Sequence, residues 1–130
     1  MQIQIDNSSN RPVYQQIIDA VKRDIALERI KLGEKLPTVR QLAGELVINP
    51  NTIAKAYRQL ETEGIITTRP GSGAFVAEMN SNISKSVRKK IVIQELERIA
   101  IDAVHMQISN EELTQWFAEV IKKFKNTFGE

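Results

Sequence analysis

The 130-residue sequence contains no cysteine and only one histidine. The lack of thiols excludes a disulfide framework and a thiolate metal site, and one imidazole is too few for a histidine-rich metal centre. Long apolar runs are also missing, and residues 1–6 lack the basic and then apolar order of a signal peptide. We therefore expect a cytoplasmic protein with no membrane span.

Catalytic signatures are equally scarce. No nucleophile stands beside a candidate base, and no glycine-rich phosphate loop is present, so we expect neither an enzyme nor a bound cofactor or metal. A hydrophobic content of 42% and a charged content of 26% are those of an ordinary globular chain, with room for one domain and an appendage. The net charge of +2 is too small to indicate a nucleic-acid partner by itself. Whether the chain binds nucleic acid has to be judged from where the charged residues lie.

The most informative stretch is residues 49–61. Asn49 is a good helix cap and Pro50 suits a first turn, so a helix is predicted from here to about residue 63. Gly64 then supplies the left-handed residue that helix ends favour. One face of this helix is apolar at helical spacing, through Ile53, Ala56, Tyr57 and Leu60.

The opposite face of this helix carries amides, a hydroxyl and cations, with no acidic residue between Pro50 and Leu60. Such a face can lie in a DNA major groove, where amides and hydroxyls reach base edges and cations reach bases or phosphates. A face that is only solvated would have a similar composition, so the stretch needs its context. The residues concerned are Asn51, Thr52, Lys55, Arg58 and Gln59.

The flanking segments predict a winged helix-turn-helix, in a fold that is mainly α with a small β-hairpin. A first helix is expected at about residues 12–28. A second helix is expected at residues 38–46, where a capping box begins at Thr38. Only three residues then connect the second helix to the third. Ile48 should fill that turn, and Leu32 and Leu36 should lie under the core. A hairpin follows at residues 65–77, and the alternation of residues 2–5 predicts a short strand.

The tip of the hairpin, residues 70–73, is rich in glycine, with Arg69 at its base. Small side chains at Gly71, Ser72 and Gly73 let backbone N–H groups approach phosphates or a minor groove. The same glycines are also what a tight turn needs, and the sequence leaves both explanations open.

Four runs together resemble the GntR family of bacterial transcription regulators, and they are RPVYQQI (11–17), LPTVRQLA (36–43), NPNTIAKAY (49–57) and GSGAFV (71–76). The resemblance implies a DNA-binding winged helix over residues 10–78. It places the DNA contacts at Arg40, at Asn51, Thr52 and Lys55, and at Gly71, Ser72 and Gly73. Some members have an arginine where Ala54 stands, so the DNA contact made by that arginine is missing here and Lys55 or Arg58 would replace part of it. For this reason no operator sequence can be transferred from the family.

The C-terminal segment, residues 79–130, predicts two helices, one at about 83–106 and one behind a capping box that begins at Ser109. Apolar residues recur in a heptad-like pattern on both, so we expect dimerisation through this segment. Trp116 and Phe117 would otherwise line a small-molecule pocket, and His105 is expected at a surface or interface rather than in a metal site. The predicted dimer contacts are Val92, Leu96, Ile99, Ala103, Met106, Leu113, Trp116, Phe117, Val120 and Phe124.

So short a two-helix tail resembles the YtrA subfamily of that family. The resemblance implies a homodimeric repressor that binds a palindromic operator on double-stranded DNA, often of a transporter operon, with any small-molecule effector unknown. The predicted domains are residues 1–78, for DNA binding, and 79–130, for dimerisation. The alternative is a winged-helix module that binds another protein, because fold does not dictate function.

Overall fold

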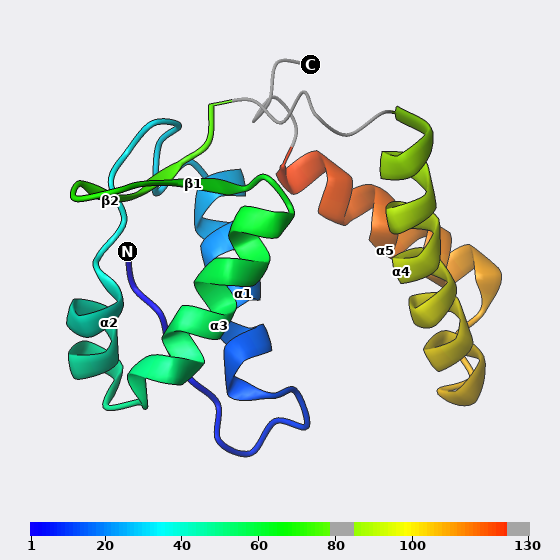
Figure 1. Cartoon of the computed structure of the whole chain (residues 1–130). Coiled ribbons are helices and arrows are strands. Elements are labelled where there is room, and N and C mark those ends of the chain that lie inside the picture. The colour runs from blue at the N-terminus through cyan, green and yellow to red at the C-terminus, as the bar shows by residue number, and fades with distance from the viewer. Residues whose placement is uncertain (79–84, 125–130) are drawn as a thin grey trace. The chain divides into compact units, whose positions relative to one another are not determined.

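The computed structural model describes residues 1–78 and 85–124 (Figure 1). The chain divides into two units, Met1–Asn80 and Ser81–Glu130. The described elements of the first unit are α1 (Val13–Ala26), α2 (Val39–Leu46), α3 (Pro50–Thr62), β1 (Ile66–Arg69) and β2 (Gly73–Val76). Those of the second unit are α4 (Lys85–His105) and α5 (Asn110–Lys123).

The helix starts follow their capping residues. The Thr38 hydroxyl accepts from the Gln41 N–H at 3.0 Å and the Gln41 side chain accepts from the Thr38 N–H at 2.9 Å, so the predicted capping box is confirmed. The Asn49 side chain likewise accepts from the N–H of Asn51 at 2.8 Å, with Pro50 in the first turn of α3. Gly64 has the expected positive φ, 75°, and directly follows Glu63, the C-cap of α3.

The core of the first unit lies where α1 and α2 pack against α3, with β1 beside the end of α3 (Figure 1). Burying this much branched aliphatic surface is the main favourable term in folding. The large side chains buried most completely, with at most 2% exposure, are Ile17, Ile18, Val21, Ile30, Leu42, Ile53, Leu60, Ile66 and Val76.

The turn between α2 and α3 has one unusual residue. Val47 adopts a left-handed conformation, with φ 54° and ψ 53°, although it is β-branched, and it is 89% exposed. Directly after it, the N–H of Ile48 donates to the Ala43 carbonyl at 3.0 Å, and its side chain packs against the core. The prediction that Ile48 fills this turn is confirmed.

The hairpin is antiparallel, with Ile66 opposite Val76 and Arg69 opposite Gly73. A third segment lies along the other edge of β2, where Lys35 forms a bridge with Phe75. The N–H of Leu36 donates to the Ala74 carbonyl at 2.8 Å, and the N–H of Val76 donates to the Glu34 carbonyl at 2.9 Å. The loop before α2 therefore supports the hairpin.

Two local predictions are wrong. Residues 2–5 form no strand, because no neighbouring segment of the described chain pairs with them; their alternation instead puts Ile3 and Ile5 against the core while Gln2 and Gln4 stay exposed. Leu36 is buried as expected, but Leu32 is 45% exposed, because the chain turns there and Gly33 takes a φ of 83°.

The second unit contains little core of its own. α4 ends at a turn in which Gln107 has a positive φ and the N–H of Ile108 donates to the Ala103 carbonyl at 3.0 Å. The Ser109 capping box of α5 is confirmed. Ala103 is the one buried side chain among those described in residues 85–124. The predicted linker at 80–82 and the first turn expected at residue 83 lie outside the described residues.

None of the helices described in residues 1–78 and 85–124 combines the length and apolarity that crossing a membrane requires.

Candidate nucleic-acid interface

The outer face of α3 presents the polar side chains that the sequence places there. Asn51, Lys55, Arg58 and Gln59 are exposed, and Thr52 is half-buried. The opposite face holds Ile53, Ala56, Tyr57 and Leu60 in the core. Because four buried residues fix the rotation of the helix about its axis, the polar face has a defined direction.

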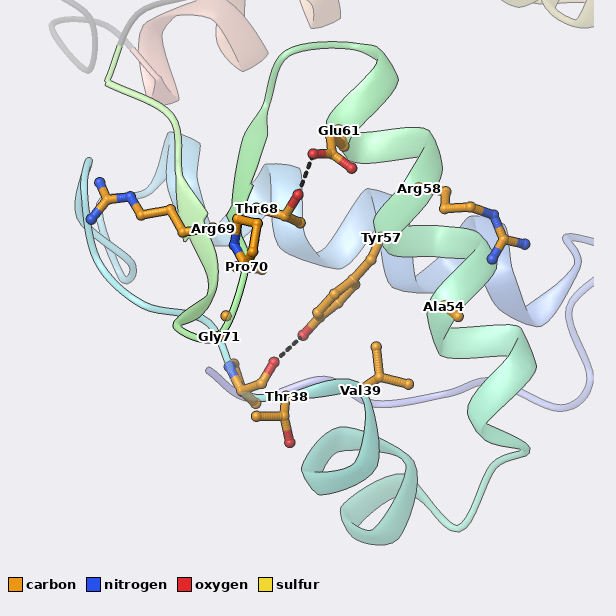
Figure 2. Close-up of a pocket in the computed structure, with 13 residues that line it drawn as sticks. Thr38, Val39, Ala54, Tyr57, Arg58, Glu61, Thr68, Arg69, Pro70 and Gly71 are labelled. Carbon is orange, nitrogen blue, oxygen red and sulfur yellow. Dashed lines mark hydrogen bonds between the residues drawn. The ribbon is translucent and has the colours of Figure 1, made fainter.

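A hydrogen bond across the helix-turn-helix fixes α3 relative to the start of α2. The Tyr57 hydroxyl donates to the carbonyl of Pro37 at 2.7 Å, one residue before the cap of α2 (Figure 2). The Tyr57 side chain is buried, and this burial, helped by the negative charge of Glu45, raises the pKa of its phenol above the ordinary value. The phenol therefore remains a hydrogen-bond donor at neutral pH.

Arg40 is exposed in the first turn of α2. Neither Arg40 nor Arg58 forms an ion pair with any residue in the described part of the chain. In contrast, Arg11 on the approach to α1 is already paired with Asp19 at 2.8 Å. Arg40 and Arg58 are thus available to an anionic partner.

The glycines at the hairpin tip are needed by the backbone itself. Gly71 and Gly73 have φ values of 76° and 116°, and a Cβ at Gly73 would stand 3.0 Å from Cε of Lys35. The N–H of Ser72 donates to the Arg69 carbonyl at 2.9 Å and closes the turn. Turn geometry therefore accounts for both glycines, and contact with DNA at the tip stays a prediction.

Arg69 stacks over Phe75, with the guanidinium carbon 4.2 Å from the ring centroid. Figure 2 shows that the Arg69 side chain extends outward from the hairpin, whereas the Arg58 side chain extends from α3 in the opposite direction. Between them, α3, the start of α2 and the hairpin enclose a groove of about 480 Å³, lined by Val39, Ala54, Tyr57, Pro70 and other residues. Arg58 and Arg69 both contribute to the lining of this groove, although their side chains point in opposite directions.

Lys55 has a partner on another helix. Its Nζ lies 3.9 Å from the ring centroid of Tyr14, in the first turn of α1. The side chain thus leans from the exposed face of α3 toward α1.

Three supporting residues were missed by the sequence reasoning. Lys35 lies across the hairpin beside Gly73, and Tyr14 and Phe75 each hold a cation. These contacts join positions far apart in the chain, so no local pattern could have found them.

The second unit leaves most of the predicted dimer contacts uncovered in the single chain. Trp116, Phe117 and Val120 of α5 are 44%, 45% and 50% exposed, whereas Ala103 is buried within the unit itself. Leu96, Leu113 and Phe124 are partly buried. Val92, Ile99 and Met106 of α4 and its turn are exposed, as are four further apolar residues of α4, Ile91, Ile93, Ile101 and Val104.

His105 is exposed at the end of α4. Across residues 1–78 and 85–124, no cluster of three or more histidine, aspartate and glutamate side chains is placed to hold a metal ion.

Comparison with known proteins places these features among bacterial regulators. The model of the gntR family of bacterial regulatory proteins matches residues 13–76. The HTH-type transcriptional repressor YtrA of Bacillus subtilis (strain 168) is 38% identical over 118 residues, which cover 91% of each chain.

Two solved structures are similar as well. A transcriptional antiterminator from Listeria monocytogenes EGD-e matches with a TM-score of 0.83 and 27% identity, over 100% of this chain and 95% of that one. The DNA-binding domain of AraR, solved in complex with operator ORE1, matches with a TM-score of 0.51 and 27% identity, over 59% of this chain and 94% of that one.

Proposed function

This chain belongs to the gntR family of bacterial regulatory proteins, and from that premise we propose that it is a repressor that binds a two-fold symmetric operator as a homodimer. Membership makes it a DNA-binding transcriptional regulator rather than an enzyme. Repression is supported by the similarity to YtrA of Bacillus subtilis, which is named a transcriptional repressor and aligns with 91% of this chain. The observation that carries the proposal is the exposed, acid-free face of α3 from Asn51 to Gln59, fixed in direction by its buried side.

We assign base selection to Asn51, Thr52 and Arg40. An amide can form a bidentate pair with adenine and a guanidinium can form one with guanine, each worth about 1–3 kcal/mol of discrimination. Lys55, Arg58 and Arg69 would supply most of the affinity through phosphates. A structural neighbour, the DNA-binding domain of AraR, was solved in complex with an operator, which supports DNA contact by the matching region of this chain.

The dimer part of the proposal is supported by the exposure of apolar residues on α4 and α5. A helix with apolar residues on several sides needs a covering surface, and a second copy of the same segment is the simplest one. Two-fold symmetry would then present two copies of α3 to half-sites about one helical turn apart. By analogy with the YtrA-like arrangement, we extend the proposal to control of a transporter operon.

The test is fluorescence-anisotropy titration against the DNA upstream of its own gene and against a scrambled duplex, at two salt concentrations. Wild-type protein should prefer the upstream duplex. Asn51→Ala should lose about 1–3 kcal/mol of that preference while binding scrambled DNA as before, because the amide reads a base.

Gln107→Ala is the matched control, because it removes an exposed amide from the turn after α4. It should leave both affinities unchanged. Weak binding by the wild type, without sequence preference at either salt concentration, would contradict the proposal and favour a protein partner for the winged helix.

A further inference from the structure

The contact between Lys55 and Tyr14 joins the candidate DNA-reading helix to the first turn of α1. The ammonium lies 3.9 Å from the ring centroid, within the range in which the electron-rich face of an aromatic ring attracts a cation. Tyr14 is half-buried and packs against the core, so the ring is held in place. Lys55 itself is exposed, and without the ring its long side chain would sample many rotamers.

The position of the ammonium distinguishes two roles for Lys55. Asn51 lies one turn before Lys55 on the same exposed face of α3, but the ring draws the Lys55 ammonium off that face and toward α1. A charge held to the side of a recognition helix lies nearer the walls of the major groove, where the sugar-phosphate backbone runs, than a charge that points into the groove. The ring covers only one side of the ammonium, which leaves N–H donors for a phosphate oxygen.

We propose that Tyr14 is a positioning residue for DNA binding, which holds Lys55 beside α3 so that its ammonium meets a backbone phosphate and adds affinity without reading sequence. The inference rests on the proposed function. The inference predicts that the ring strengthens DNA binding, because it stays under the ammonium in the complex. If Lys55 had to leave the ring in order to reach DNA, the ring would instead weaken binding.

The experiment compares wild type, Tyr14→Phe, Tyr14→Leu, Lys55→Met and the Tyr14→Leu/Lys55→Met double variant on the upstream and scrambled duplexes over a salt series. Phenylalanine keeps the ring, and leucine keeps the apolar packing but removes the ring. Tyr14→Leu should weaken binding to both duplexes by roughly two- to ten-fold, because the Lys55 side chain would then have to be ordered at the moment of binding. Tyr14→Phe should match wild type.

Lys55→Met should also weaken binding to both duplexes equally and should reduce the salt slope by about 0.9 for each protomer bound. In that background, Tyr14→Leu should have no further effect. Arg23→Gln, which removes a cation nine positions after Tyr14 on the same helix, is the control for net charge and should change either affinity less than about two-fold.

Three results would overturn the inference while wild-type binding leaves the proposed function intact. These are a Tyr14→Leu variant that binds as tightly as wild type or more tightly, a Tyr14→Leu loss that persists in the Lys55→Met background, and a Lys55→Met loss confined to the upstream duplex. The second result would show that Tyr14 acts only on the scaffold, and the third that Lys55 reads a base. Failure of the wild type to bind either duplex would reject the proposed function and this inference together.

Discussion

Gly44 occupies an exposed position within α2, and no atom lies within 4 Å of the place where a Cβ would stand. Glycine inside a helix costs about 1 kcal/mol relative to alanine, chiefly because the unfolded chain has more freedom to lose. We expect Gly44→Ala to raise the free energy of unfolding by about 1 kcal/mol, which for a unit of this size raises Tm by about 4–8 °C. Urea and thermal unfolding followed by circular dichroism would measure both.

The matched control is Gly73→Ala. Its φ of 116° is a conformation that alanine rarely adopts, and the Lys35 side chain, whose Cε lies 3.0 Å from the Cβ position, would have to shift, so the same substitution should lower stability there. A Gly44→Ala protein no more stable than wild type would show that α2 gains nothing from a stiffer backbone.

At the scale of elements, Tyr57 connects α3 to the loop before α2 through its bond to the Pro37 carbonyl. Tyr57→Phe should lower the free energy of unfolding at neutral pH by about 1 kcal/mol, the net value of such a hydrogen bond. The raised pKa of Tyr57 adds a pH dependence. Its unfolded pKa is near 10, so this contribution is fully present below about pH 10 and is lost as pH rises, because only the unfolded chain gives up the proton easily.

Urea unfolding of wild type and Tyr57→Phe at pH 7 and at about pH 10.5 would measure this. The difference in stability between the two proteins should shrink at the higher pH. Lysine deprotonation affects both proteins alike and cancels. A difference that stays constant or grows with pH would show that the phenol is not held in its neutral form.

The elements themselves could largely be predicted from sequence, because their determinants are local. The Thr38–Gln41 and Ser109–Glu112 boxes and the Asn49-Pro50 start each satisfy N–H groups within a few residues. The predictions that failed needed information from elsewhere in the chain. Residues 2–5 have the right period for a strand but no partner, and Leu32 depends on where the turn at Gly33 points.

The candidate site divides in the same way. Exposure of Asn51, Lys55 and Arg58 followed from the helical period alone. The ring beneath Lys55 belongs to a residue 41 positions earlier, and Lys35 reaches the hairpin across all of α2 and α3. Such contacts depend on packing, which a single sequence does not display.

At the scale of the whole molecule, the apolar residues of α5 determine the expected assembly. Val120→Asp would place a carboxylate among side chains that are half exposed in the single chain and that we propose to be covered in a dimer. Wild type should sediment as a dimer at micromolar concentration and the variant as a monomer. The variant should bind a duplex with two half-sites at least about ten-fold more weakly, since linked sites no longer raise the local concentration.

Gln115→Asp adds the same charge on α5 outside the apolar positions and should leave the dimer intact. Binding to a single half-site should be equal in all three proteins. A wild type that sediments as a monomer, or a Val120→Asp protein that remains dimeric, would exclude α5 as the contact.

The bridge between Lys35 and Phe75 also bears on the order in which the chain folds. It closes a loop of forty residues that contains both α2 and α3, and closing a loop of this length costs entropy that compact helices inside it reduce. We therefore expect the hairpin to gain its third segment after the two helices have docked. During synthesis and refolding, Lys35 and Arg69, the two cations beside Phe75, should reach their final places last. A partly folded chain would then have a formed α3 before its hairpin was complete.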